Sequence, residues 1–238
     1  MMLPIRSATL FCAICAVVSA ADTSGKLTIY LAGKPVATEN YSIKSGGGKI
    51  WIDGSGSYDM GLLKIDIEQF KVVTDEKYKP LEAVAKALMG KAKMAVDATF
   101  SGETVKSKVD TGQGPTDKED AVHGDDLVIN ANLPIFPWSL LMARVKLDTK
   151  EPQQFYAYVL GQSEAPLTIV SKGKETVEFA NKKASLHHLS GNMTLPAGPL
   201  EADFWIDDDR KIIKMLAPGL GVEVYQEGFE KVIVAGGK

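Results

Sequence analysis

The stretch KAKMAVDATF at residues 91–100 carries the pattern that decides the fold. Apolar side chains recur at every second position up to Phe100, and Lys93, Asp97 and Thr99 stand between them. Successive side chains of a strand point to opposite faces, so the apolar ones would share one surface. The alternation therefore predicts a half-buried β-strand.

The same alternation recurs along the chain, for example at residues 26–31 and 200–207. Short turn-forming segments separate these runs: Gly33-Lys34, Gly46-Gly47-Gly48, Asp59-Met60-Gly61, Ser101-Gly102, Lys172-Gly173-Lys174 and residues 207–210. Short strands joined by such turns favour an antiparallel meander over βαβ units. We expect a mainly β protein, with a strongly curved antiparallel sheet that forms a half-barrel or open barrel and carries one or two short helices.

Two segments depart from the alternation and predict helices. In Pro80–Met89, proline suits the first helical turn, Leu81, Val84 and Leu88 share a helical face, and a glycine follows. A second short helix is expected at residues 138–143. Residues 110–126 are polar and rich in glycine and acids, which predicts a long loop or flexible link. We expect residues 21–238 to form one β-rich domain.

Residues 1–20 have the composition of a secretory signal peptide, with an apolar run after Arg6 and small residues before a predicted cleavage site at Ala21. Both cysteines of the chain, Cys12 and Cys15, lie in this leader. The mature chain would then have no thiol nucleophile, disulfide or thiolate metal site. A cysteine-free exported chain is typical of the bacterial envelope, so we expect a periplasmic or extracellular protein.

The remaining chemistry gives no catalytic template. The net charge is −3 and no basic face is evident, which argues against nucleic acid as a partner. The mature chain has no apolar segment long enough to cross a membrane. Isolated motifs lack the partners that their chemistry needs: one Asp110-Thr111-Gly112, the dispersed His123, His187 and His188, and the acidic residues 207–209. We expect a non-enzyme with no catalytic residue, cofactor or metal site.

The segment Leu133-Pro134-Ile135-Phe136-Pro137-Trp138 is the most distinctive apolar stretch. It could plug one end of the β core, line or cover an apolar ligand site, or contact a protein partner. On the ligand-binding hypothesis, the candidate contact residues come from this segment and from the predicted helix at Pro80–Met89. They are Leu133, Phe136, Trp138, Leu141, Leu81, Val84 and Leu88.

A family resemblance appears over residues 125–230. Its parts are Asp126-Leu127-Val128-Ile129 before the proline-bracketed loop, the strands at 155–160 and 167–171, Phe204-Trp205-Ile206-Asp207 with residues 211–215, and the closing residues 221–228. Their order resembles uncharacterised exported bacterial proteins and, more distantly, the open barrel of the lipoprotein carriers LolA and LolB. The resemblance implies a concave face or cavity for apolar groups and supplies no catalytic residues.

These observations predict a periplasmic, non-enzymatic binding or carrier protein for a lipid, a lipid-linked molecule or a lipidated polypeptide. One alternative is a structural or interaction module of an envelope complex. A second is a hydrolase that uses a carboxylate pair, for which Asp53, Asp66 and Glu68 are acids on predicted strands. The oligomeric state stays open at this point.

Overall fold

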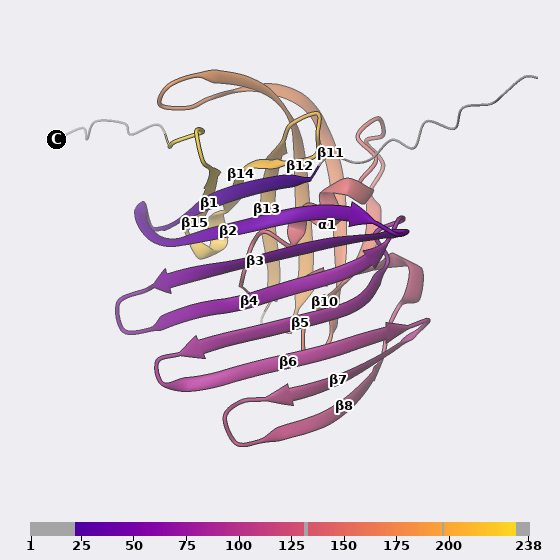
Figure 1. Ribbon diagram of the computed structural model, residues 1–238. Coiled ribbons are helices and arrows are strands. Elements are labelled where there is room, and N and C mark those ends of the chain that lie inside the picture. The colour runs from indigo at the N-terminus through magenta and orange to yellow at the C-terminus, as the bar shows by residue number, and fades with distance from the viewer. Residues whose placement is uncertain (1–21, 131–132, 197, 232–238) are drawn as a thin grey trace, which may run out of the picture.

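The computed structural model describes residues 22–130, 133–196 and 198–231, so the predicted signal peptide at residues 1–20 lies outside the described part. The described chain forms one sheet of 15 strands and one α-helix (Figure 1). The elements are β1 (Thr23–Leu31), β2 (Lys34–Gly46), β3 (Lys49–Asp59), β4 (Lys64–Asp75), β5 (Pro80–Met89), β6 (Ala92–Ser101), β7 (Thr104–Asp110), β8 (Pro115–Ala121), β9 (Leu127–Asn130), α1 (Trp138–Arg144), β10 (Gln153–Val159), β11 (Glu164–Glu178), β12 (Lys183–Leu195), β13 (Gly198–Ile206), β14 (Ile212–Ala217) and β15 (Val222–Gln226), with short 3₁₀ turns η1 (Gly124–Asp126) and η2 (Pro218–Leu220).

The sheet is built from two meanders. The strand order is β8-β7-β6-β5-β4-β3-β2-β1-β15-β14-β13-β12-β11-β10-β9, so the first and last strands of the chain pair at its centre. All the pairs are antiparallel except β9–β10, and the sheet is not closed, since β8 and β9 are its two ends. The expectation of a mainly β, largely antiparallel protein with short turns is confirmed.

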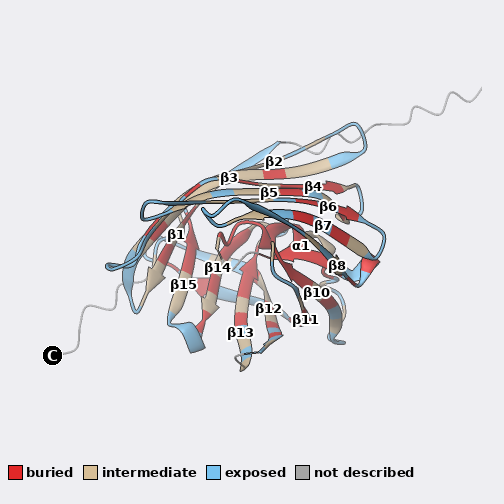
Figure 2. Cartoon of the chain, turned by 90° about the horizontal axis from the view of Figure 1, so that it is seen from below, coloured by how far each residue is buried: buried red, intermediate tan, exposed pale blue. Residues whose placement is uncertain are grey.

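The two halves of the sheet face each other. Figure 2 shows β2–β8 in one layer and β10–β15 in the other, with buried residues on the facing sides and α1 between the layers. Side chains from the two halves meet in this space: the rings of Phe100 on β6 and Tyr158 on β10 lie 5.8 Å apart, edge to face. Aromatic pairs of this geometry add specific contacts to the burial of apolar area.

Helix α1 belongs to the crossover between the parallel strands β9 and β10, a connection that cannot be made by a tight turn. Two arginines hold the helix in place. Arg144 donates to the carbonyl of Leu127 at 2.6 Å, and Arg210 donates to the carbonyl of Val145 at 2.5 Å just after the helix. The helix predicted at residues 138–143 is confirmed. The two arginine hydrogen bonds connect it to β9 and to the β13–β14 turn.

The helix predicted at Pro80–Met89 is wrong, because this segment is strand β5. It pairs along its length with β4 and with β6. The positions of Leu81, Val84 and Leu88 fit a helical face, but pairing with two neighbouring strands overrides this local preference. Gly90, with φ +63°, forms the β5–β6 turn instead of capping a helix.

Two further expectations need correction. Residues 110–126 are not a flexible link, since they contain edge strand β8, which pairs with β7 over its whole length. Its charged composition is typical of an exposed sheet edge, where charge discourages pairing with other chains. Residues 172–174 are not a turn either: β11 continues through them with a register shift between Ser171 and Gly173, and Gly173 has φ +93°.

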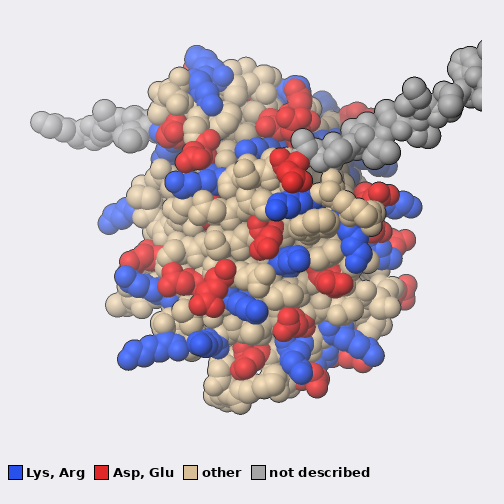
Figure 3. Space-filling model, viewed as in Figure 1, with Lys and Arg blue, Asp and Glu red and all other residues tan. Residues whose placement is uncertain are grey.

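The outer face of the β1–β8 half carries basic and acidic side chains interspersed with each other (Figure 3). No large area of one sign is visible on this face. Across β11–β15, a second apolar cluster lies outside the main core; its buried members are Val177, Phe179, Leu186, Trp205, Ile213 and Tyr225. The main core, by contrast, lies between the two halves and includes α1.

Candidate functional site

The buried carboxylate of Glu39 organises the segment at residues 133–138, named here the proline loop, which leads into α1. Glu39 lies on β2 with 0% of its surface exposed. It accepts hydrogen bonds from the backbone N–H of Ile135 at 2.7 Å and of Phe136 at 2.9 Å, and a third from the Tyr58 hydroxyl. A buried carboxylate is tolerated only when its oxygens are hydrogen-bonded, and these three donors meet that need. Glu39 thereby ties the loop before α1 to strands β2 and β3.

Burial has the largest effect on the pKa of the Glu39 carboxyl. Removal from water raises the pKa of Glu39 to about 7, although the hydrogen bonds from Tyr58, Ile135 and Phe136 act in the opposite direction. The same burial, together with the negative charge of Glu39, raises the pKa of Tyr58 far above its ordinary value. Tyr58 is therefore a hydrogen-bond donor to Glu39 and stays neutral throughout the physiological range.

Phe136 is the plug of the interior. Its ring is fully buried, stacks on Tyr41 at 5.7 Å and meets Phe70 edge to face at 6.0 Å. Gly54 makes this position available, because a Cβ there would lie 2.7 Å from the Phe136 ring and 2.5 Å from the carbonyl of Asn40. The register shift between Gly54 and Gly56 marks a bulge at this place.

Beside this plug lies an apolar pocket with a volume of about 450 Å³. None of the described side chains that line it carries a formal charge. Its walls come from both halves of the sheet and from the proline loop: Ile29, Leu31, Val36, Tyr58, Met60, Asn130, Leu133, Ile135, Trp138, Met193, Leu195, Gly198, Pro199, Leu200, Met215, Ala217, Leu220 and Val222. Ligand pockets of about 300–1,000 Å³ with mainly apolar walls are typical of small-molecule sites.

The pocket has a closed inner part and an open mouth. Its inner wall includes Tyr58, Met193 and Met215, which are all buried. Its outer wall includes Met60 and Leu220, whose exposed fractions are 36% and 56%. Since these two residues lie in the β3–β4 and β14–β15 connections, the mouth opens at the end of the sheet where those turns lie.

Asn130 is the one side chain of the described pocket wall that has a buried polar atom without a hydrogen-bond partner. It is 3% exposed, its Nδ2 donates to the Met193 sulfur at 3.5 Å, and its Oδ1 has no hydrogen-bond partner. A buried amide oxygen without a partner is costly, and a sulfur is a weak acceptor for the other end of the amide. The amide of Asn130 is therefore the group of this wall best suited to a polar atom of a ligand.

The sequence-predicted contact residues separate into three groups. Leu133 and Trp138 line the apolar pocket, whereas Phe136 and Leu141 are fully buried and fill the core beside it. Leu81, Val84 and Leu88 lie on β5 and do not line the apolar pocket.

Of the residues that line the apolar pocket, only Leu133 and Trp138 were predicted from the sequence. Residues such as Met193, Met215 and Leu220 belong to strands and turns far along the chain from the proline loop. Their alternation predicts an inward-facing side chain and does not tell which inward positions remain uncovered. A weak signal exists in the turns 60–63 and 218–221, which are apolar where turns are ordinarily polar.

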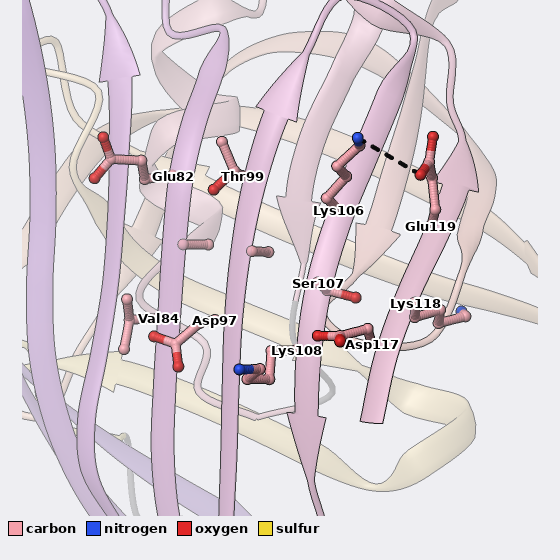
Figure 4. A pocket seen from close by; sticks show the side chains of 12 residues that line it. Glu82, Val84, Asp97, Thr99, Lys106, Ser107, Lys108, Asp117, Lys118 and Glu119 are labelled. Carbon is pink, nitrogen blue, oxygen red and sulfur yellow. Dashed lines mark ion pairs between the residues drawn. The ribbon is translucent and has the colours of Figure 1, made fainter. Parts of the chain in front are cut away.

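A second, polar groove with a volume of about 640 Å³ crosses β5–β8 (Figure 4). Its charged side chains form cross-strand rows, with Asp97 opposite Lys108 and Lys108 opposite Asp117. Lys106 and Glu119 form an ion pair at 3.7 Å, the dashed line in Figure 4. Opposite charges on neighbouring strands stabilise their pairing, so this arrangement has a structural explanation.

The acids considered for a hydrolase are not assembled in the apolar pocket. Asp53 on β3 lies opposite Lys71, and Asp66 on β4 accepts a hydrogen bond from the Ser57 hydroxyl at 2.6 Å. Glu68 is exposed at a register shift of β4. None of the three lines the pocket.

None of the three histidines lines the apolar pocket, and His123 lies on a different part of the chain from the other two. His187 and His188 are adjacent on β12 and contact different acids, Asp208 at 3.0 Å and Asp203 at 3.0 Å. His123 stacks on Tyr156 and contacts Glu164. Within residues 22–130, 133–196 and 198–231, no three His, Cys, Asp or Glu side chains are grouped as metal ligands would be.

No family model and no curated protein matches this sequence. Among solved structures, the chain is similar to a DUF1089 family protein from Pseudomonas aeruginosa, with 11% identity, a TM-score of 0.49, and coverage of 76% of this chain and 90% of that one. It is also similar to a Bacteroides fragilis protein named as exported and as having a YmcC-like fold, with 7% identity, a TM-score of 0.30, and coverage of 87% and 93%. In the described part of the chain, no helix is long and apolar enough to cross a membrane.

Proposed function

We propose that this protein is a non-enzymatic binding or carrier protein for a lipid or another apolar molecule, and that the pocket beside the proline loop holds it. The observation that carries the proposal is the uncharged, largely apolar wall around about 450 Å³, with an open mouth at one end of the sheet. The bent sheet serves as an open-barrel scaffold. The predicted leader would place this activity in the periplasm or outside the cell.

The chemistry of the wall supports binding of a neutral group. A charged headgroup placed inside would lose its hydration without finding a partner of opposite charge among the described lining residues. An acyl chain, in contrast, gains the free energy of apolar burial, roughly 25 cal/mol for each Å² removed from water. We therefore place the hydrocarbon part of the ligand inside and any charged part at the mouth.

The proline loop supports a preformed pocket. Leu133, Ile135 and Trp138 contribute to the wall, and Glu39 holds the backbone N–H groups of Ile135 and Phe136. A wall fixed in this way reduces the entropy that must be lost when a ligand binds.

The proposal is tested with the mature chain and an apolar fluorescent probe, N-phenyl-1-naphthylamine, followed by displacement with fatty alcohols. The variant Leu200→Trp should fill the outer pocket and weaken probe binding about tenfold or more. The matched control is Glu201→Trp, at the next position of β13, where the side chain is exposed and does not line the pocket. Equal binding by the wild type and Leu200→Trp, or no probe binding by the wild type, would overturn the proposal.

Native mass spectrometry of protein purified from its own cells gives an independent test. We expect a copurified apolar molecule that Leu200→Trp lacks. An empty protein that also fails to take up lipid in vitro would shift the weight to the alternative, an interaction module of an envelope complex.

A further inference from the structure

We infer that the end of the sheet around the pocket mouth docks onto a lipid surface. This inference rests on the proposed function for the direction of ligand transfer, but its evidence is separate, because it concerns the outside of the molecule. The surface consists of four turns around the mouth, named here the mouth turns: residues 32–33, 60–63, 195–196 and 218–221.

The strand registers bring the mouth turns together. Leu31 at the end of β1 pairs with Lys34 across the first turn and with Val222 on β15. Ala217 and Val222 pair across the 218–221 turn. Residues of each turn or of its flanking strands line the same pocket, for example Leu31, Met60, Leu195 and Leu220. The β1–β2 and β3–β4 turns lie at the left edge of Figure 1.

The composition of the mouth turns is unusual for surface turns. Their described residues are Ala32, Gly33, Met60, Gly61, Leu62, Leu63, Leu195, Pro196, Pro218, Gly219, Leu220 and Gly221, with no charged or hydrogen-bonding side chain among them. At the opposite end, the turns at residues 76–79 and 207–211 are charged, and the β2–β3 turn consists of Gly47 and Gly48 without a large apolar side chain. Because turns are ordinarily solvated, an apolar set at one end alone indicates contact with an apolar phase.

The exposed apolar side chains lie at this end. The large hydrophobic residues that are exposed in the described chain are Met60, Leu62, Leu63, Met89 and Leu220. The first three share the β3–β4 turn, Leu220 lies in the β14–β15 connection, and Met89 precedes the neighbouring β5–β6 turn. Leu62 is fully exposed. Burial of such side chains in lipid provides most of the binding free energy of interfacial segments.

The form and charge of this end favour a lipid surface over a folded protein. The leucines and methionines protrude from separate glycine- or proline-containing turns, which suits insertion between lipid chains. Lys34 and Lys91 stand beside these turns and are exposed, where ammonium groups can contact anionic headgroups, whereas Lys64 forms an ion pair with Asp59 at 3.0 Å. The pocket opens among the same turns, so an acyl chain could pass between bilayer and pocket without crossing water.

The test is flotation of the mature chain with vesicles of phosphatidylethanolamine and phosphatidylglycerol. We expect the wild type to float with the vesicles and the double variant Leu62→Asp/Leu63→Asp to bind at least about tenfold more weakly, since two inserted side chains are replaced by charges. The control is Lys77→Asp, which changes the net charge by the same amount at the opposite end of the sheet and should float like the wild type.

The outcomes separate this inference from the proposed function. Probe uptake in the pocket without vesicle binding, or equal flotation of the wild type and the double variant, would overturn docking and leave the pocket proposal standing. Vesicle binding by a chain that takes up no probe would overturn the pocket proposal and leave docking standing. Leu62 and Leu63 do not line the pocket, so the double variant should keep its probe affinity and its unfolding temperature.

Discussion

The Oε2 atom of Glu39 accepts a hydrogen bond from the backbone N–H of Phe136 at 2.9 Å, across 97 positions of the chain. This bond joins β2, the second strand of the first meander, to the proline loop, which contributes to the pocket wall. Because the carboxyl is fully buried, its protonation is linked to the stability of the whole fold.

The folded state should lose stability as the pH rises from about 4.5 to about 7. The pKa of Glu39 is raised from 4.5 to about 7, so in this interval the folded chain holds a proton that the unfolded chain has released. The contribution is fully present below the unfolded pKa and is lost through the folded pKa, at a cost of up to about 3 kcal/mol. Urea unfolding across this range measures it.

The control for that experiment is Glu39→Gln, which cannot titrate. Its unfolding free energy should lack this component of the pH dependence, whatever its absolute value. A wild type and a Glu39→Gln variant with parallel pH profiles would contradict the assignment.

Gly54→Ala should destabilise the protein by about 1–3 kcal/mol, because the new methyl group would overlap the Asn40 carbonyl and the Phe136 ring. The measurement is the midpoint of thermal or urea unfolding. Gly46→Ala is the matched control, since its Cβ would meet only Trp51 at an ordinary 3.6 Å. Similar losses in the two variants would show that close packing at Gly54 is not the cause.

Asn130→Leu should leave the stability unchanged or raise it by about 1 kcal/mol, because it removes a buried amide whose oxygen has no partner. The same change should alter ligand preference. A hydroxyl can donate to Oδ1 and also accept from an amide N–H, so the wild type should favour dodecanol over dodecane. Asn130→Leu should lose that preference in probe displacement. Unchanged preference would exclude a polar contact at Asn130.

Trp138 should report on occupancy of the pocket. It lines the pocket, whereas Trp51 and Trp205 do not. Binding of an acyl ligand should therefore change tryptophan emission in the wild type and in Trp51→Phe. The response should disappear in Trp138→Phe. A response that survives in Trp138→Phe would place the ligand elsewhere.

The local periodicity of apolar residues was sufficient to predict most of the strands. The alternation in β1, β6 and β13 appears in the structure as predicted, and the turns predicted at Gly33-Lys34 and Ser101-Gly102 lie within one residue of those positions, at 32–33 and 102–103. The short helix after Pro137 could also be recognised, because its proline and apolar residues are local signals. These features depend on neighbouring residues, which the sequence states directly.

Other features depend on partners that are distant in the chain. Pro80–Met89 is a strand because β4 and β6 pair with it on either side, and β8 is ordered because β7 pairs with it. From the sequence alone, Glu39 would be expected to be an exposed acid like the others. Only the fold brings the backbone N–H groups of Ile135 and Phe136 within hydrogen-bond distance of its carboxylate.

The sequence by itself determined a β-rich chain, its turns and the apolar character of the proline loop, since these follow from side-chain periodicity and backbone preference. Only the tertiary structure decided that Leu133 and Trp138 border an open pocket while Phe136 fills the core beside it. All three are bulky and apolar within a single loop. Their different environments arise because a bulge at Gly54 admits one ring and the facing strands leave space beside the others.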